Sequence, residues 1–219
     1  MGRLVGVFGN AGFGREVMPL LRRQLRDSHP ADELVFVAPT VEAPVNGVAV
    51  VTEADFLASP RVRAFAIAIA DSATRRRLHS LAIDSGAEAL EVRAGSAELL
   101  DEVMLGAGAI LCGHSSISSN TRVGVGFHLN ISSYLAHDCL VGDFVTFGPN
   151  VVCAGNVTVK DGAYIGGGAL IRQGKPGAPV VIGAGATVGM GAVVTKSVPP
   201  GAVVVGNPAR ILQKGQRHE

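Results

Sequence analysis

One apolar residue recurs every six positions through the second half of the chain. Neither an α-helix, with about 3.6 residues per turn, nor a plain strand, with a period of about two, produces this spacing. A coil whose flat sides each take six residues does, because one inward apolar residue per side stacks on its equivalent in the next coil. The period therefore predicts a solenoid of parallel β coils. The slots are Leu99, Leu105, Leu111, Ile117, Val123, Leu129, Leu135, Val141, Phe147, Cys153, Val159, Ile165 and Ile171, then, after an interruption at 175–179, Ile182, Val188 and Val194.

Small residues and glycines accompany each slot of this repeat. A small or β-branched residue lies four positions after most inward slots, as at Cys139 and Ala163, where it fits a corner of the coil. Glycines such as Gly124, Gly142 and Gly166 follow the inward residues directly. Because glycine adopts backbone conformations that other residues avoid, we expect these glycines to permit the sharp turns.

The first half of the chain alternates apolar runs with amphipathic stretches. Strands are predicted at 4–8, 34–37, 48–51 and 65–69, and helices at 15–26, from 53 and at 73–83. Such alternation is typical of a parallel sheet with helices on its faces. The chain thus divides into an α/β part and an all-β part.

Composition and charge narrow the class of protein. The net charge is +1, from 19 basic and 18 acidic residues, which gives no electrostatic reason to expect a nucleic acid or an anionic membrane as partner. Three cysteines without a CxxC pair fit reduced thiols in a cytoplasm. No apolar run approaches the roughly 20 residues that span a bilayer, and the glycine-rich start does not suit a signal peptide. We expect a soluble, cytoplasmic protein.

Several motifs carry a resemblance to a known family: the hexapeptide repeats, GNAGFGRE (9–16), ADSATRRR (70–77), AHDCLVGDF (136–144), CAGNV (153–157) and VVVGNPARI (203–211). Together they resemble the bacterial sugar acetyltransferases, hexapeptide-repeat enzymes that acetylate nucleotide-linked amino sugars or sialic acid hydroxyls. The resemblance implies an α/β Rossmann-like (nucleotide-)sugar-binding domain over 1–95. It further implies an all-β left-handed parallel β-helix over 96–219, whose C-terminal segment covers CoA, and assembly into a homotrimer.

The resemblance also implies a catalytic pair. His137 corresponds to the family's general base, which removes a proton from the attacking amine or hydroxyl, a task that an imidazole can perform at neutral pH. Asp138 follows it and would orient the ring and stabilise its charged form. Gly155 lies eighteen residues later, so it should stack one coil away, where its amide could donate to the thioester carbonyl of acetyl-CoA. Transfer would be direct, without Cys139 or Cys153 as an acyl carrier.

Other candidate residues bind the two substrates. Arg172, Lys175 and Lys196 are possible partners for the phosphates of CoA, and Asn130 corresponds to an asparagine that contacts the acceptor in relatives. Thr146 stands where some relatives have a second histidine. Asp71 and Ser72, which end the predicted strand 65–69, are candidates for a contact with the sugar or base.

A glycine-rich turn after the first strand is the expected phosphate site. Gly9, Gly12 and Gly14 give G-x-x-G-x-G before a helix, whose N-terminal amides favour an anion. The spacing differs from the dinucleotide fingerprint, and residues 35–40 (VFVAPT) lack the acid that would hold an adenosine ribose, which disfavours an NAD enzyme. A turn that serves only for packing remains the alternative.

The predicted function is transfer of an acetyl group from acetyl-CoA to an amino or hydroxyl group of a sugar, with no metal. Two other classes stay open: a non-catalytic β-helical scaffold or sugar-sensing protein, and a metal-dependent lyase on the same helix. His114, His128 and His137 do not reproduce the ligand spacing of β-helical zinc enzymes. The sequence leaves open which sugar and nucleotide are used, and whether nitrogen or oxygen is acetylated.

Overall fold

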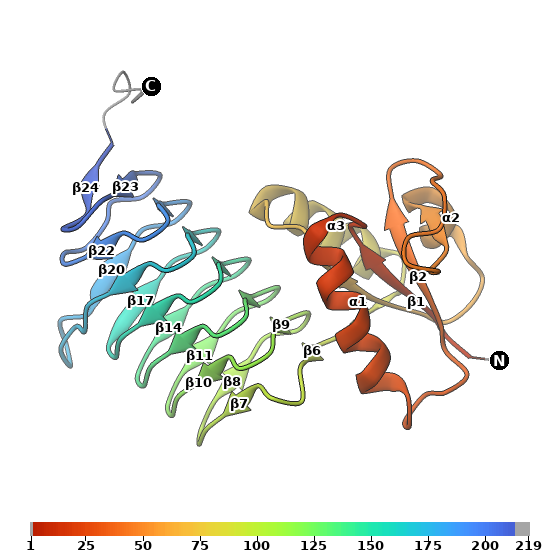
Figure 1. Cartoon of the computed structure of the whole chain (residues 1–219), viewed down its shortest axis with the longest axis horizontal. Helices are drawn as coiled ribbons and strands as arrows, with labels where there is room; N and C mark the ends of the chain where they lie inside the picture. Colours follow the sequence, from red (N-terminus) through yellow and green to blue (C-terminus); the bar gives the residue numbers. More distant parts are fainter. Residues whose placement is uncertain (1, 213–219) are drawn as a thin grey trace.

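A five-stranded parallel sheet forms the first part of the computed structural model, which describes residues 2–212 (Figure 1). The strand order is β3-β2-β1-β4-β5. The strands are β1 (Leu4–Phe8), β2 (Glu33–Ala38), β3 (Val50–Thr52), β4 (Arg63–Ile67) and β5 (Glu88–Ala89), and the helices are α1 (Gly12–Leu25), α2 (Glu53–Ala58) and α3 (Ser72–Asp84). The predicted alternation of strands and helices is therefore present.

Element boundaries differ from the prediction by up to three residues, and strand β5 was not predicted; two of the shifts have a plain physical reason. Helix α1 begins at Gly12 rather than residue 15, because the first turn of a helix has no intrahelical partners for its N–H groups and so tolerates glycine. Strand β4 ends at Ile67 rather than residue 69. The chain leaves the sheet there to reach Asp71, whose side chain caps α3 by accepting a hydrogen bond from the Thr74 amide at 2.7 Å.

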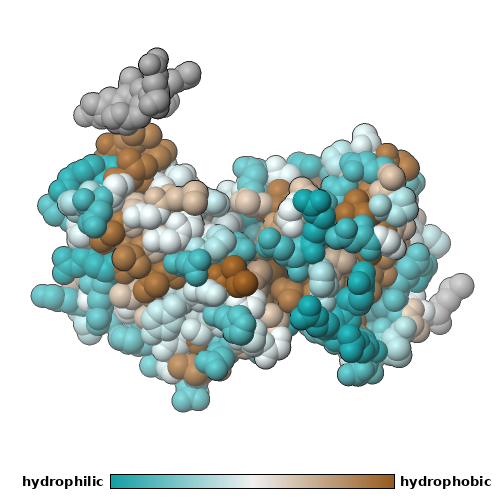
Figure 2. All heavy atoms as spheres, in the orientation of Figure 1, coloured by the Kyte–Doolittle hydropathy of each residue, from teal (hydrophilic) through white to brown (hydrophobic). Residues whose placement is uncertain are grey.

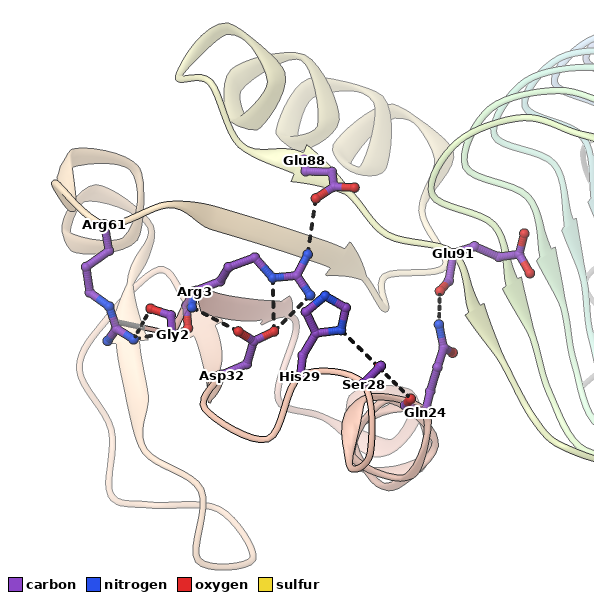
Figure 3. Close-up of polar contacts among 9 residues, drawn as sticks. All are labelled: Gly2, Arg3, Gln24, Ser28, His29, Asp32, Arg61, Glu88 and Glu91. Carbon is purple, nitrogen blue, oxygen red and sulfur yellow. Dashed lines mark hydrogen bonds and ion pairs between the residues drawn. The ribbon is translucent and has the colours of Figure 1, made fainter.

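Polar contacts hold the amino-terminal edge of this sheet together (Figure 3). The Arg3 guanidinium donates to Asp32 at 2.8 Å and to Glu88 at 3.2 Å. Arg3 precedes β1, Asp32 lies in the turn that leads into β2, and Glu88 belongs to β5, so these contacts link three strands. These Arg3 contacts lower the pKa of the Asp32 carboxyl against the opposing effect of its burial. Gln24 of α1 donates to the Glu91 carbonyl at 2.8 Å, which ties the helix to the start of the coils.

The second part is a column of coils with three parallel sheets along its sides. One sheet has six strands: β7 (Glu98–Leu99), β10 (Ser116–Ile117), β13 (Tyr134–Leu135), β16 (Val152–Cys153), β19 (Leu170–Ile171) and β22 (Val193–Val194). The second has five: β8 (Met104–Leu105), β11 (Arg122–Val123), β14 (Leu140–Val141), β17 (Val157–Val159) and β20 (Val180–Ile182). The third has eight: β6 (Val92–Arg93), β9 (Ile110–Leu111), β12 (His128–Leu129), β15 (Thr146–Phe147), β18 (Tyr164–Ile165), β21 (Thr187–Val188), β23 (Val203–Val205) and the antiparallel β24 (Arg210–Ile211).

The predicted six-residue period is confirmed by strand register. Ile117, Leu135 and Cys153 pair across successive strands, so one coil takes eighteen residues. From Leu111 onward every predicted inward slot is buried, and together these side chains form the core of the column. These parallel sheets fit the left-handed β-helix of the acyltransferases.

The role predicted for the glycines after the inward residues is wrong. Gly124, Gly142 and Gly166 do not have a positive φ; the turn positions are instead occupied by residues such as Gly126 and Gly162. A Cβ at Gly142 would lie 2.8 Å from the Asp161 amide nitrogen, and a Cβ at Gly124 2.7 Å from the Gly142 carbonyl carbon. These glycines are needed because adjacent coils approach too closely for a side chain.

The α/β part packs on the side of the column formed by the eight-stranded sheet. The His128 ring lies 5.1 Å from the Phe13 ring, and the buried Arg75 donates to the Gly126 and Phe144 carbonyls. Strand β6 pairs with β9, so residue 92 already belongs to a sheet of the coils. The division into 1–95 and 96–219 stays a prediction, and its residues 213–219 lie outside the described part.

The surface differs between the two parts. Figure 2 shows hydrophilic side chains over α1 and apolar ones near β23 and β24.

Within residues 2–212, no helix is long and apolar enough to cross a membrane.

Candidate active site

His137 and Asp138 form a hydrogen-bonded pair at a corner of the column. The corner joins β13 of the six-stranded sheet to β14 of the five-stranded sheet, and both side chains are about half exposed. The ring nitrogen Nδ1 lies 2.7 Å from Asp138 Oδ2. An ionised carboxylate can only accept, so this contact favours the tautomer of the neutral ring in which Nδ1 carries the hydrogen and Nε2 keeps a lone pair that can take a proton. The geometry matches that of an oriented general base.

Gly155 lies directly beneath this imidazole, one coil further on. A Cβ built on Gly155 would be 2.5 Å from Cε1 and 2.6 Å from Nε2 of His137. The predicted stacking of the two residues is therefore present, and the ring occupies the space that a side chain would fill. Among residues 2–212, the Gly155 N–H donates to no protein acceptor. Gly155 itself is buried, so this N–H is a donor without a protein acceptor in the described part of the chain, beside the His137 ring.

The three basic candidates lie further along the column. Arg172 follows β19 and donates to the Thr195 carbonyl at 3.4 Å. Lys175 lies in the hairpin at 175–178, and Lys196 follows β22. Gly174 donates to the Gly155 carbonyl at 3.0 Å, so this hairpin begins on the corner that carries His137.

The three glycines of the turn at 9–14, hereafter the glycine turn, differ in their surroundings. Gly9 has a φ of +97°, and a Cβ at Gly14 would lie 1.9 Å from the Gly9 carbonyl oxygen, so both are required by the backbone itself. A Cβ at Gly12 would meet nothing within 4 Å. Ala11 precedes the helix without a side-chain cap, which leaves the first amides of α1 open to an anion. Backbone conformation and packing explain why glycine is needed at positions 9 and 14, but they give no reason for a glycine at position 12.

Asp71 and Ser72 begin α3 beside the eight-stranded sheet. Asp71 caps the helix, and the hydrogen bonds from Thr74 lower the pKa of its carboxyl. Both residues line a hollow of about 320 Å³ together with Thr146 and Tyr164. Thr146 is buried, and its hydroxyl accepts a hydrogen bond from Arg75 at 3.0 Å.

Asn130 lies at a different corner of the coil that carries His137. It follows β12 at the junction of the eight- and six-stranded sheets, and its amide donates to the Phe147 carbonyl at 3.2 Å. Within one chain, the structure brings together His137, Asp138 and Gly155. It does not bring Asn130 or the glycine turn to them.

Sequence reasoning missed two residues near the ends of β1 and β4. Glu42 accepts a hydrogen bond from Asn10 of the glycine turn at 2.7 Å, so an acid does reach this turn, from a loop four residues beyond β2. Arg75 is the other, fully buried between α3 and the coils. Neither residue could be selected from the sequence. Glu42 lies in a loop whose path the sequence does not predict, and Arg75 is one of three consecutive arginines.

No cluster of three or more His, Cys, Asp or Glu side chains in residues 2–212 could hold a metal ion. His128 instead contacts the Ile67 carbonyl through Nε2 at 2.9 Å.

Comparison with known proteins extends over nearly the whole chain. No family model matches. GDP-perosamine N-acetyltransferase of Escherichia coli O157:H7 is 44% identical over 214 residues, which cover 96% of this chain and 97% of that protein. The structure of WeeI from Acinetobacter baumannii AYE has 48% identity and a TM-score of 0.92, covering 96% of this chain and all of the other.

A third relative contains bound ligands. This structure is a histidine-to-asparagine mutant of perosamine N-acetyltransferase from Caulobacter crescentus in complex with CoA and GDP-perosamine. It has 27% identity and a TM-score of 0.86, and it covers 98% of each chain.

The coils and the oriented histidine at their corner define an acyltransferase of the hexapeptide-repeat β-helix class. The chain belongs to the sugar N-acetyltransferases of that class, the family of the GDP-perosamine N-acetyltransferase. The resemblance seen in the sequence motifs is thereby confirmed.

Proposed function

We propose that this protein transfers the acetyl group of acetyl-CoA to the amino group of a nucleotide-linked sugar, with a GDP-linked amino sugar as the first acceptor to test. The observation that carries this proposal is the His137 imidazole, which Asp138 holds at 2.7 Å and which is stacked on Gly155, whose N–H has no acceptor among the described residues. The names and ligands of the relatives support an amine acceptor on a guanosine nucleotide. The histidine replaced in one of them supports histidine chemistry.

The reaction follows from these positions. The sugar amine attacks the thioester carbonyl carbon, a C–N bond forms, and the C–S bond breaks to release CoA as its thiolate. His137 Nε2 takes the proton that the amine loses and can return it to the thiolate sulfur. Asp138 stabilises the imidazolium, and the Gly155 N–H donates to the carbonyl oxygen as negative charge develops there. Arg172, Lys175 and Lys196 would bind the phosphates of CoA.

The acceptor would bind to the α/β part, as a Rossmann-like nucleotide-sugar domain. Gly12 leaves space for a diphosphate beside the N-terminus of α1, and Glu42 offers a carboxylate to the ribose hydroxyls. Asp71, Ser72 and Asn130 are further candidates for the sugar. Since Asp71 already caps α3, Ser72 is the freer of the two.

The site of one chain is incomplete, which supports a homotrimer. The α/β part packs on the eight-stranded sheet, whereas His137 lies at the corner between the other two sheets. An acceptor held by one chain would thus meet the His137 of a neighbour. The outer face of the six-stranded sheet carries Tyr134, Val152 and Leu170 in register, each about 40% exposed, an apolar row suited to contact another copy.

The test is a panel of acceptors with acetyl-CoA: GDP-perosamine, UDP- and dTDP-linked amino sugars, and sialic acid, with release of free CoA as the readout. Turnover only with a nucleotide amino sugar supports the proposal. Turnover with sialic acid alone would replace it with O-acetylation, and a monomer by light scattering at micromolar concentration would contradict the shared site.

A further inference from the structure

Arg75 is a buried cation that forms no salt bridge among the described residues, although the nearby Asp71 carboxylate raises the pKa of its guanidinium against the larger effect of burial. Its side chain is 1% exposed, and all five of its N–H groups donate to neutral oxygens. Burial lowers the pKa of the guanidinium to about 10, so it stays protonated at neutral pH. A buried charge is costly unless its hydrogen bonds are satisfied, so a site that satisfies all five selects arginine over lysine.

The five hydrogen bonds join two parts of the molecule. Nη1 donates to the Ile69 and Ala70 carbonyls, at 2.7 and 3.0 Å, in the segment 68–71 that connects β4 to α3. Nε donates to the Gly126 carbonyl at 3.0 Å, and Nη2 to the Phe144 carbonyl at 2.6 Å and the Thr146 hydroxyl at 3.0 Å. Gly126 and Phe144 are corner residues of successive coils. Most of the hydrogen bonds that fix the connecting segment to the column therefore come from this one side chain, beside a longer direct bond from the Thr146 hydroxyl to the Ala70 carbonyl at 3.4 Å.

The same segment touches the residues proposed to bind the acceptor. A Cβ on Gly9 would lie 3.0 Å from the Ala68 carbonyl oxygen, so the glycine turn rests against the segment. Asp71 and Ser72 follow it directly. His128 adds a second link from the column, through Nε2 to the Ile67 carbonyl at 2.9 Å. A shift of the segment would move the glycine turn and Ser72 together.

We propose that Arg75 is a positioning residue for the acceptor: by holding the segment 68–71 against the coils, it sets where the nucleotide sugar lies relative to the base that acetylates it. The inference rests on the proposed function. It assigns to Arg75 no contact with either substrate. Arg75 acts through Ile69 and Ala70, while acetyl-CoA binds to the corner that carries His137, which these hydrogen bonds do not reach.

The experiment is steady-state kinetics of the full chain with Arg75→Lys, varying GDP-perosamine and acetyl-CoA separately. Lysine keeps the charge but can replace only part of the five-donor set. We expect the KM for the acceptor to rise about tenfold, with kcat lowered and the KM for acetyl-CoA unchanged. A KM is independent of the fraction of active enzyme, so simple partial unfolding cannot produce this split. Arg77→Lys is the matched control, because Arg77 lies on the same helix and pairs with Glu53 of α2.

If Arg75→Lys does not fold, Thr146→Val tests the same link by removing one acceptor of the guanidinium together with the direct hydrogen bond from Thr146 to the Ala70 carbonyl. A smaller rise in the acceptor KM is expected. An active wild type whose variants keep the wild-type acceptor KM overturns the positioning role alone. A variant in which both KM values rise equally also overturns it, since the effect is then not confined to the acceptor. A wild type that acetylates none of the panel refutes the proposed function, and the inference with it.

Discussion

Replacing Gly155 with alanine should remove the base from its position without unfolding the protein. The added Cβ would lie 2.5 Å from His137 Cε1, whereas ordinary contacts begin near 3.4 Å, so the ring must move by about 1 Å. The obstacle is the end of a half-exposed side chain rather than backbone, so the ring can swing away and the coil can keep its geometry. The alanine keeps its N–H, so the substitution removes the space that the ring occupies and leaves the hydrogen-bond donor in place. It therefore tests the two roles of Gly155 separately.

A misplacement of about 1 Å can cost roughly 10²-fold in rate, which lies within the 10²–10⁴-fold range typical of general-base catalysis. We therefore expect Gly155→Ala to lower kcat by about 10²-fold, with the melting temperature nearly unchanged. The assay is CoA release under saturating substrates, with thermal unfolding measured on the same samples. Gly95→Ala is a matched control, because a Cβ there meets nothing within 4 Å.

The double variant decides how Gly155 acts. If the glycine works only by giving room to the imidazole, His137→Ala/Gly155→Ala should be no slower than His137→Ala alone. Losses that multiply would show that Gly155 acts independently of His137. Near-normal turnover of Gly155→Ala would refute the reasoning, because the ring would then not need the place it occupies.

Three further outcomes follow from the same structure. His137→Ala should lower kcat by about 10²–10⁴-fold and Asp138→Asn by less, as measured by CoA release, because the second change keeps the base. Gly12→Val should fold normally and raise the acceptor KM, whereas Gly14→Ala should lower the melting temperature through its clash with the Gly9 carbonyl; equal melting temperatures would contradict this. Burial, with a smaller effect of the charge on Arg75, holds the pKa of His128 well below its usual range. As the pH falls, His128 is therefore protonated in the unfolded chain before it is protonated in the folded protein. Stability should fall as pH drops below about 6.5, by up to 1.4 kcal/mol per pH unit, and His128→Gln should flatten that slope in urea titrations.

The period predicted the column of coils because each slot has one requirement, an inward apolar side chain. Once Leu135 occupies such a slot, His137 must fall at a corner, and Gly155 must fall one coil away. That part of the candidate site follows from counting alone. The close contact between the His137 ring and Gly155 does not follow from counting, because it depends on the side-chain rotamer that the hydrogen bond to Asp138 selects.

Residues that act between the two parts could not be predicted in this way. Arg75 is one of three consecutive arginines, and only the packing of α3 on the coils decides which of them is buried. Glu42 reaches the glycine turn through a loop whose path no periodicity describes. The glycines after the inward slots were misjudged for a related reason, because their role comes from the neighbouring coil rather than from their own turn.

The order of residues along the corner sets the direction in which acetyl-CoA would bind. Backbone hydrogen bonds join Asn156 to His137 and Gly174 to Gly155, so these residues lie on successive coils spaced about 4.8 Å apart. Lys196 lies one coil beyond, roughly 15 Å from the base. A molecule with a thioester at one end and phosphates at the other fits this column only with its thioester at His137. Lys196→Ala should therefore raise the KM for acetyl-CoA severalfold and leave the acceptor KM unchanged, and an effect on the acceptor alone would place the cofactor elsewhere.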